Sequence, residues 1–339
     1  MASGALRRVA AVGLVVILGA SAPAPVGAKK SRYFDLDNAP KTKITGDQII
    51  KGLENFVERF PMRQQGTPTN IAAARFLARE SKQYGFKSRI LKFQVGSPSR
   101  TARVVEAVKR GSKRPNEYIA LVAHYDVVPG IGATVQGAYD DGSGTNMMRY
   151  FARAFSKIKL KRSLVLLWFD AEENGLLASE AYAARAREKG VDYKAVLGFD
   201  MVGVGHPAPY CICVYHGQRV EDAAIALPII DHVNFDYLDF PKGDGGDAVT
   251  EYWPFGQRGH VCSCGPNIRN SDEQSFGAEG YFTMRWAGMR RARNYPGYHQ
   301  PWDTVEMMET VAGSRSNLER GTENTFKSAY YTIFVLDRL

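Results

Sequence analysis

Three segments of the chain are almost continuously apolar, and each ends in acidic or histidine residues. They cover residues 117–126, 163–170 and 193–203. An unbroken apolar run of this length is typical of a strand that is buried on both faces of a sheet. Because segments with helical apolar spacing alternate with these strands, the pattern predicts an α/β fold. We expect a mixed, mostly parallel central β-sheet with helices on both faces.

The remaining segments show weaker but readable patterns. Residues 29–45 are polar and contain a proline, so we expect an exposed lead-in, and residues 204–298 show no regular period. No linker or internal repeat divides the chain, so residues 29–339 are predicted to form one domain. The further predicted elements are helices at 47–60, 70–85, 143–158, 176–190 and 318–339, and strands at 87–95 and 102–110.

The first 28 residues have the composition of a secretory signal. Arg7 and Arg8 precede an apolar run from Val9 to Ala20, and small residues follow up to Ala28. This order of basic, apolar and small residues predicts a cleaved signal peptide at 1–28 and a secreted or periplasmic protein. An uncleaved membrane anchor is the alternative, although the apolar run is short for a bilayer span. We therefore expect no stable membrane association after cleavage.

Charge and cysteine content restrict the function classes. The formal net charge is +9, but the basic residues are scattered and form no stripe with stacking aromatic residues, so nucleic-acid binding is disfavoured. An even cysteine count behind a signal peptide favours disulfides over a zinc site held by four thiolates. Three pairings are open, and we favour cross-links between the two C-x-C pairs. The four residues are Cys211, Cys213, Cys262 and Cys264.

Polar chemistry is concentrated at the ends of the three predicted core strands. Ligands of open α/β sheets bind outside the carboxyl ends of the strands. Neighbouring parallel strands would therefore bring these side chains to one crevice, and the turn "GAYDDGSG" would add two more. The set comprises His124, Asp126, Asp170, Glu172, Glu173, Asp200, Asp140 and Asp141.

So many carboxylates in one crevice need compensating positive charge. Without it the fold would be destabilised or several groups would take up protons. Imidazole together with carboxylates suits zinc, and one carboxylate can bridge two ions, as in two-metal hydrolases. A second imidazole is needed, and His299 in "PGYHQPWDT" is the best candidate. His206, His216, His232 and His260 lack such flanking signals.

These motifs together resemble a known family. "AHYD", "GAYDDGSG", "FDAEENGLLAS", "GFDMVG" and "YHQPWDT" follow one another in order. They are similar to the motifs of the M28 family of dizinc peptidases, and of its secreted aminopeptidases in particular. The resemblance covers most of the chain beyond residue 28.

The resemblance implies a role for each of these residues. His124, Asp140 and Asp200 would hold one zinc ion, and Asp140, Glu173 and His299 a second, with Asp140 as the bridge. Metal-bound hydroxide would be the nucleophile and Glu172 the general base, while Asp126 would orient His124. Asp140 and Asp141 would be joined by a cis peptide bond, and Tyr298 would stabilise the oxyanion. The substrates would be peptides with a free N-terminus.

Some features depart from the family pattern and leave alternatives open. Glu273 stands where the family often has histidine. Residues 241–270 match no family segment, and a flap over the site is one interpretation of them. A dipeptidase and a single-zinc glutaminyl cyclase share the fold and similar residues. A non-catalytic interaction protein is a third alternative, but it would be expected to have lost ligand residues.

Overall fold

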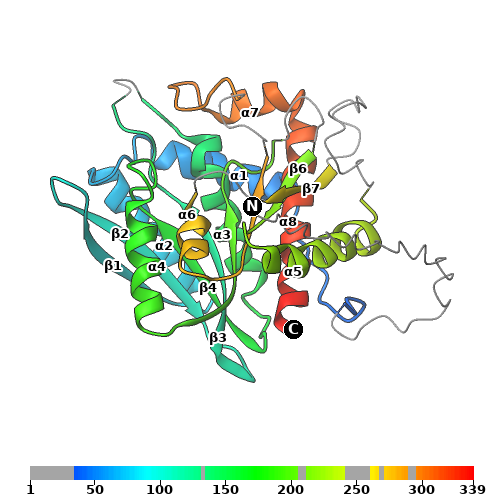
Figure 1. Ribbon diagram of the computed structural model, residues 1–339. Helices are drawn as coiled ribbons and strands as arrows, with labels where there is room; N and C mark the ends of the chain where they lie inside the picture. Colours follow the sequence, from blue (N-terminus) through cyan, green and yellow to red (C-terminus); the bar gives the residue numbers. More distant parts are fainter. Residues whose placement is uncertain (1–33, 131–133, 205–210, 241–259, 267–270, 289–294) are drawn as a thin grey trace, which may run out of the picture.

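The computed structural model describes residues 34–130, 134–204, 211–240, 260–266, 271–288 and 295–339 (Figure 1). Side chains are not described at 211 and 260–263. In chain order the elements are α1 (Gly46–Arg59), α2 (Pro68–Gln83), β1 (Lys87–Val95), β2 (Arg100–Lys109), β3 (Arg114–His124), the short turn η1 (Ala138–Gly142), α3 (Ser143–Ala154), β4 (Arg162–Phe169), α4 (Leu177–Glu188), β5 (Asp192–Phe199), β6 (Cys211–His216), α5 (Val220–Ile230), η2 (Asp231–Tyr237), β7 (His260–Pro266), α6 (Asp272–Ala278), β8 (Thr283–Ala287), α7 (Val305–Ala312) and α8 (Arg315–Arg338).

The strands of the described residues form one mixed sheet. Their order across the sheet is β1-β2-β4-β3-β5-β8-β6-β7. The central strands β4, β3, β5 and β8 are parallel, whereas β1, β2 and β6 pair antiparallel with their neighbours on the central side. The predicted α/β fold with a mostly parallel mixed sheet is confirmed.

Both faces of the central strands are buried. Along β3, Ile119 and Leu121 belong to one hydrophobic cluster, while Ala120 and Val122 belong to the other. Helices α1, α3 and α8 cover the first face, and α4 and α6 cover the second (Figure 1). Because successive side chains of a strand point to opposite faces, burial on both sides explains the unbroken apolar run in the sequence.

A line of aromatic rings anchors the end of β5. Phe151 of α3 stacks on Phe326 of α8 at 4.4 Å between ring centroids, and it packs against Phe199 at 5.3 Å. Phe199 in turn stacks on Trp286 of β8 at 5.5 Å. Such ring pairs are favourable beyond the area they bury. They hold the strand end that immediately precedes Asp200.

Two sequence predictions about irregular segments need correction. Within the expected exposed lead-in, Leu36, Ala39 and Ile44 are buried and join the main core. Single apolar residues separated by polar ones produce no period, although each can still reach the core. The region 204–298 also contains more regular structure than its pattern indicates. Strand β8 was missed because it is only five residues long and carries a charged residue, Arg285.

The cysteine prediction is confirmed for one pair. Cys213 of β6 and Cys264 of β7 form a disulfide, which links the two C-x-C pairs as expected. The side chains of Cys211 and Cys262 lie outside the described residues. Of the possible flap at 241–270, residues 241–259 and 267–270 also lie outside them, and β7 occupies the rest. The predicted signal at 1–28 lies outside the described residues as well. Among the described helices, none has the length and apolar character needed to span a bilayer.

Candidate active site

The sheet topology brings the predicted strand-end residues together. Strands β4, β3 and β5 are adjacent and parallel, so their carboxyl ends lie at one edge. His124 ends β3, Glu172 and Glu173 follow β4, and Asp200 follows β5. The turn η1 and the loop before α7 supply two further residues. We call the resulting set the carboxylate pocket; it consists of His124, Asp140, Glu172, Glu173, Asp200 and His299.

Two groups of side chains in the carboxylate pocket have the geometry of metal-binding groups, and they share Asp140. His124, Asp140 and Asp200 form the His124 group, and Asp140, Glu173 and His299 form the His299 group. Within each group, one ligand atom per residue lies within 4.8 Å of the others.

The two oxygens of Asp140 face different histidines. Oδ1 lies 3.2 Å from His124 Nε2, and Oδ2 lies 3.4 Å from His299 Nε2. His299 Nε2 also lies 3.0 Å from Oε2 of Glu173. A carboxylate in this position can contact two cations at once.

Several polar atoms of the carboxylate pocket are buried without a hydrogen-bond partner among the described residues. They include Nε2 of His124, Oε1 of Glu173 and Oδ1 of Asp200. Buried polar atoms without partners are costly, and most proteins avoid them. Imidazole nitrogen and carboxylate oxygen are also the donor types that zinc prefers. The donor set and its unpaired atoms therefore fit divalent cations.

Burial and mutual proximity perturb the ionisation of the carboxylate pocket. Burial raises the pKa of Glu172 well above its ordinary value, and it raises the pKa of Glu173 to about 7. Burial alone would lower the pKa of His299, but Asp140 and Glu173 raise it to about 10. Without a cation, this pocket therefore retains protons that a metal ion would displace.

Glu172 and Tyr298 stand beside the two groups. Oε2 of Glu172 lies 3.9 Å from Nε2 of His124, so this carboxylate faces the pocket. The ring of Tyr298 stacks on His299, with 3.8 Å between centroids. Burial raises the pKa of Tyr298, and the nearby carboxylates Asp140 and Glu173 raise it further. Tyr298 therefore keeps its hydroxyl proton at neutral pH and can donate a hydrogen bond.

Asp126 supports more of the site than the sequence indicated. Its Oδ1 lies 3.4 Å from Nδ1 of His124, and its own backbone carbonyl oxygen lies 3.2 Å from the same nitrogen. The same carboxylate also accepts hydrogen bonds from the backbone N–H groups of Glu172 and Glu173, both at 3.3 Å. One buried side chain therefore links the end of β3 to the turn that follows β4. The His-x-Asp spacing does not predict the contact with the backbone of Glu172 and Glu173.

Asp141 ties together the backbone segments around Asp140. Its carboxylate accepts hydrogen bonds from the backbone N–H groups of His124 at 3.3 Å, Gly144 at 2.8 Å and Met201 at 3.2 Å. These donors come from β3, α3 and the end of β5. The peptide bond between Asp140 and Asp141 is cis, as the resemblance implied. Gly144 is required here because a Cβ would lie 2.2 Å from the carbonyl oxygen of Phe199.

Two further supporting residues were missed from the sequence. Asp303 accepts hydrogen bonds from the backbone N–H groups of Tyr139 at 2.9 Å and Asp140 at 3.0 Å, so it fixes the position of Asp140. Arg63 is fully buried and donates to the carbonyl oxygens of Gln136 and Gly137. Asp303 lies four residues after His299 in the quoted motif, which was the available signal. Arg63 lies in an ordinary polar turn that offered none.

Other candidate residues lie away from the pocket or outside the description. His216 is buried and pairs with the carbonyl of Gly217, and His232 packs against Phe34. His206 and the side chain of His260 lie outside the described residues. Glu273, which stands where the family often has histidine, is buried beside β5, where its Oε2 lies 2.4 Å from the position that a Cβ on Gly198 would occupy.

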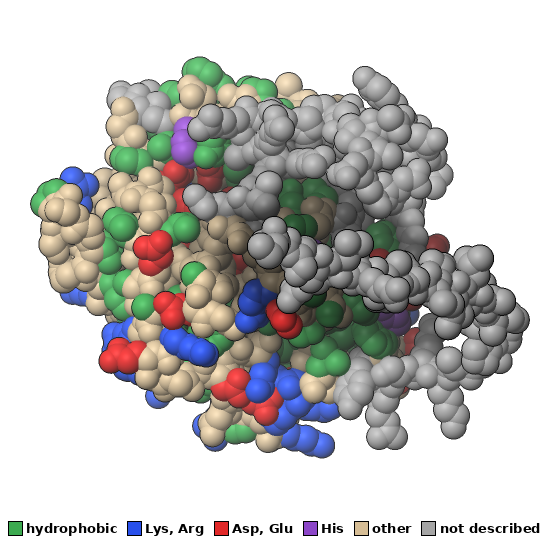
Figure 2. Space-filling model, in the orientation of Figure 1, with side chains coloured by type: hydrophobic (Ala, Val, Ile, Leu, Met, Phe, Trp, Pro, Cys, Tyr) green, Lys and Arg blue, Asp and Glu red, His purple; other side chains and the backbone are tan. Residues whose placement is uncertain are grey.

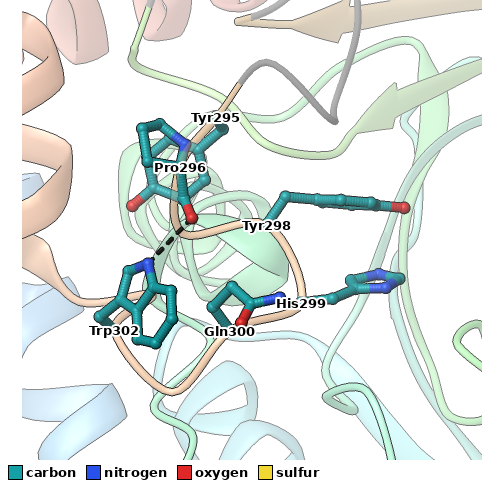
Figure 3. A pocket seen from close by; sticks show the side chains of 6 residues that line it. All are labelled: Tyr295, Pro296, Tyr298, His299, Gln300 and Trp302. Carbon is teal, nitrogen blue, oxygen red and sulfur yellow. Dashed lines mark hydrogen bonds between the residues drawn. The ribbon is translucent and has the colours of Figure 1, made fainter.

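An open cavity lies next to His299. Its volume is about 500 Å³, and Figure 3 shows the six residues that line it. Tyr298 and His299 extend side by side on one side, whereas Trp302 stands opposite and donates from Nε1 to the carbonyl of Pro296 at 2.9 Å. Figure 2 shows a histidine beside acidic side chains on the visible surface of the molecule. The cavity thus offers aromatic surface next to the His299 group.

Comparisons show which known proteins this sequence is similar to. The sequence model described as "Peptidase family M28" matches residues 103–317. Aminopeptidase YwaD of Bacillus subtilis is 25% identical over 223 residues, which cover 65% of this chain and 43% of that protein. A probable zinc metalloprotease of Leptosphaeria maculans is 28% identical over 175 residues, covering 46% of this chain and 40% of that protein. The chain therefore spans less than half the length of these two curated relatives.

Solved structures share the fold. The LapA aminopeptidase of Legionella pneumophila has a TM-score of 0.62 at 21% identity, covering 95% of this chain and 81% of that chain. A glutaminyl cyclase of Fimbriiglobus ruber has a TM-score of 0.63 at 15% identity, covering 88% of this chain and 97% of that chain. Two activities thus occur on closely similar folds, so the fold alone does not select between them.

The ionisation of the site predicts a pH dependence of stability. Burial raises the pKa of Asp170, Asp272 and Asp303 to about 7, like that of Glu173. The metal-free native state therefore binds more protons than the unfolded chain between the unfolded and folded pKa values. Its free energy of unfolding should fall as the pH rises from about 5 to about 7, by at most about 1.4 kcal/mol per pH unit for each group.

Denaturant unfolding of chelator-treated protein at several pH values measures this slope. The Asp170→Asn variant should show a shallower slope because it removes one of the titrating groups. Bound zinc should also flatten the profile because it replaces protons at Glu173. A free energy of unfolding that rises across this interval in the metal-free protein would contradict the prediction.

Proposed function

The chain belongs to peptidase family M28, and from this premise we propose that it is a zinc-dependent exopeptidase acting on the N-terminus of peptides. The observation that supports this proposal most strongly is that two candidate metal-binding groups share Asp140 at the carboxyl ends of three parallel strands. The names of related proteins, an aminopeptidase and a zinc metalloprotease, support the same activity.

We propose that the His124 group and the His299 group each hold one zinc ion, with Asp140 common to both. Zinc would supply Lewis acidity, which polarises the scissile carbonyl and makes water a better nucleophile at neutral pH. Asp126 holds His124 in a fixed orientation and keeps the Glu172–Glu173 turn against β3. Asp303 and Asp141 fix the backbone on either side of the shared carboxylate.

Glu172 is proposed as the general base. It lies beside His124 but belongs to neither metal-binding group, so its carboxylate can accept a proton from water. Burial raises its pKa, which favours holding that proton until it passes to the leaving amine. Tyr298 keeps its hydroxyl proton and stacks on His299, from which position it can donate to the developing oxyanion.

The same acidic surface accounts for a preference for free N-termini. A protonated α-amino group carries positive charge, and the carboxylate pocket offers several acidic oxygens within one buried crevice. An acylated N-terminus lacks that charge and would not be attracted by the carboxylate oxygens that the zinc ions leave free. We therefore propose peptides with a free N-terminus as the substrate class.

A substrate panel tests the proposed activity. The purified protein should release nitroaniline from aminoacyl-nitroanilides and show no activity on their N-acetylated forms. A chelator should abolish the release, and added zinc should restore it. Cyclisation of an N-terminal glutamine without hydrolysis would instead establish a glutaminyl cyclase. Activity on dipeptides alone, with longer peptides untouched, would establish a dipeptidase.

The role of Glu172 predicts a specific kinetic result. Glu172→Gln should retain zinc but lose turnover by about 10²–10⁴-fold, because the isosteric amide cannot accept the proton. Tyr298→Phe should retain zinc and lose about 10²–10³-fold, the usual effect of removing one oxyanion donor. The exposed Glu180, on α4, provides the matched control Glu180→Gln, which should leave turnover unchanged. Turnover near that of the wild type in zinc-loaded Glu172→Gln would refute this assignment.

We also propose that residues 1–28 are a cleaved export signal and that residues 29–339 form the catalytic domain. The disulfide between Cys213 and Cys264 supports an oxidising compartment. Mass spectrometry of the exported protein should find Lys29 as the first residue. Recovery of the intact N-terminus in the membrane fraction would contradict cleavage.

A further inference from the structure

A buried arginine contacts one of the two metal-binding groups. Nη2 of Arg285, on β8, lies 2.8 Å from Oδ2 of Asp200, and both side chains are buried. The other oxygen of Asp200, Oδ1, is buried and has no hydrogen-bond partner among the described residues. One oxygen of Asp200 therefore accepts a hydrogen bond from the guanidinium, and only the other oxygen is available to a cation.

The Arg285 side chain donates a hydrogen bond to the carboxylate of Asp200. Its Nε and Nη1 atoms are buried without hydrogen-bond partners in the described part of the chain. Asp200 and Glu273 are the principal carboxylates that act on it, and Tyr215 and Glu172 also contribute. Arginine remains charged under all ordinary conditions. A permanent positive charge thus contacts one member of the His124 group, Asp200.

The His299 group has no such arginine contact among the described residues. In the described part of the chain, His299 forms ion-pair contacts with Glu173 and Asp140, and Glu173 forms one with His299 alone. The second buried arginine near the site, Arg63, donates to the backbone carbonyls of Gln136 and Gly137. Among the described residues it forms no ion pair with Glu173 or His299.

We propose that Arg285 makes the two groups unequal, so that the His299 group binds zinc more tightly than the His124 group. The guanidinium withdraws electron density from Asp200 and repels a divalent cation, and a buried location screens this repulsion poorly. This inference rests on the proposed zinc sites but not on the reaction that they catalyse. Arg285 is thus a positioning residue that holds Asp200 to a single free oxygen.

Two cations that share Asp140 repel each other, so stepwise binding to the wild type would not test the inference. Each group must be measured alone. His124→Ala leaves the His299 group, and His299→Ala leaves the His124 group. Zinc affinity is then measured by competition with a chromogenic chelator on metal-free protein. We expect the His299→Ala variant to bind zinc at least tenfold more weakly than His124→Ala.

The contribution of Arg285 is measured in the His299→Ala background. Adding Arg285→Gln removes the charge and should strengthen zinc binding at least tenfold, whereas Arg285→Lys retains the charge and should leave it weak. Arg162, a buried arginine paired with Glu117 at the opposite end of β4, provides the control Arg162→Gln, which should change nothing. If the Arg285→Gln protein does not fold, the comparison of the two single histidine variants still decides the ranking.

The outcomes separate this inference from the proposed activity. Equal affinities of the two histidine variants, or tighter binding by His299→Ala, would overturn the inference, as would no change on Arg285→Gln. Neither result would bear on hydrolysis by the wild type. Conversely, unequal zinc sites in a protein that hydrolyses no substrate would support the inference and contradict the proposed function.

Discussion

The structure depends on the concentration of buried negative charge at one edge of the sheet. Three adjacent parallel strands end in acidic or histidine residues, and the turn η1 places Asp140 between them. Carboxylates buried this closely are destabilising unless protons or cations balance them. The raised pKa values of Glu172 and Glu173 are the response of the protein when only protons are available. Cations would resolve the same conflict, and in the proposed function they would also supply the chemistry.

The carboxylates around the site have two different roles. Glu173 and Asp200 each present an oxygen without a hydrogen-bond partner among the described residues, and Asp140 faces both histidines. In contrast, Asp126, Asp141 and Asp303 accept hydrogen bonds from backbone N–H groups. The hydrogen bonds of Asp126, Asp141 and Asp303 fix the backbone that carries the carboxylates facing the pocket. The site residues therefore lie on strand ends and short turns. The hydrophobic cores on the two faces of the sheet hold these segments in position.

Much of this could be predicted from the sequence, for physical reasons. Strands buried on both faces leave a continuous apolar run, and a parallel sheet places their polar ends together. His124, Glu172 and Asp200 could therefore be predicted as site residues from their positions at the strand ends. Arg63 and Arg285 did not, because a buried arginine has the same sequence appearance as an exposed one. The second contact of Asp126 and the buried position of Glu273 depend on backbone groups and neighbours distant in sequence. Such contacts leave no local pattern.

The most direct test is anomalous diffraction at the zinc absorption edge, from crystals grown with zinc. The account predicts an anomalous peak within coordination distance of the Asp140 carboxylate, on the side of Glu173 and His299. At high zinc concentration a second peak should occur on the side of His124 and Asp200. Zinc bound only elsewhere on the molecule, with no peak at Asp140, would contradict the account.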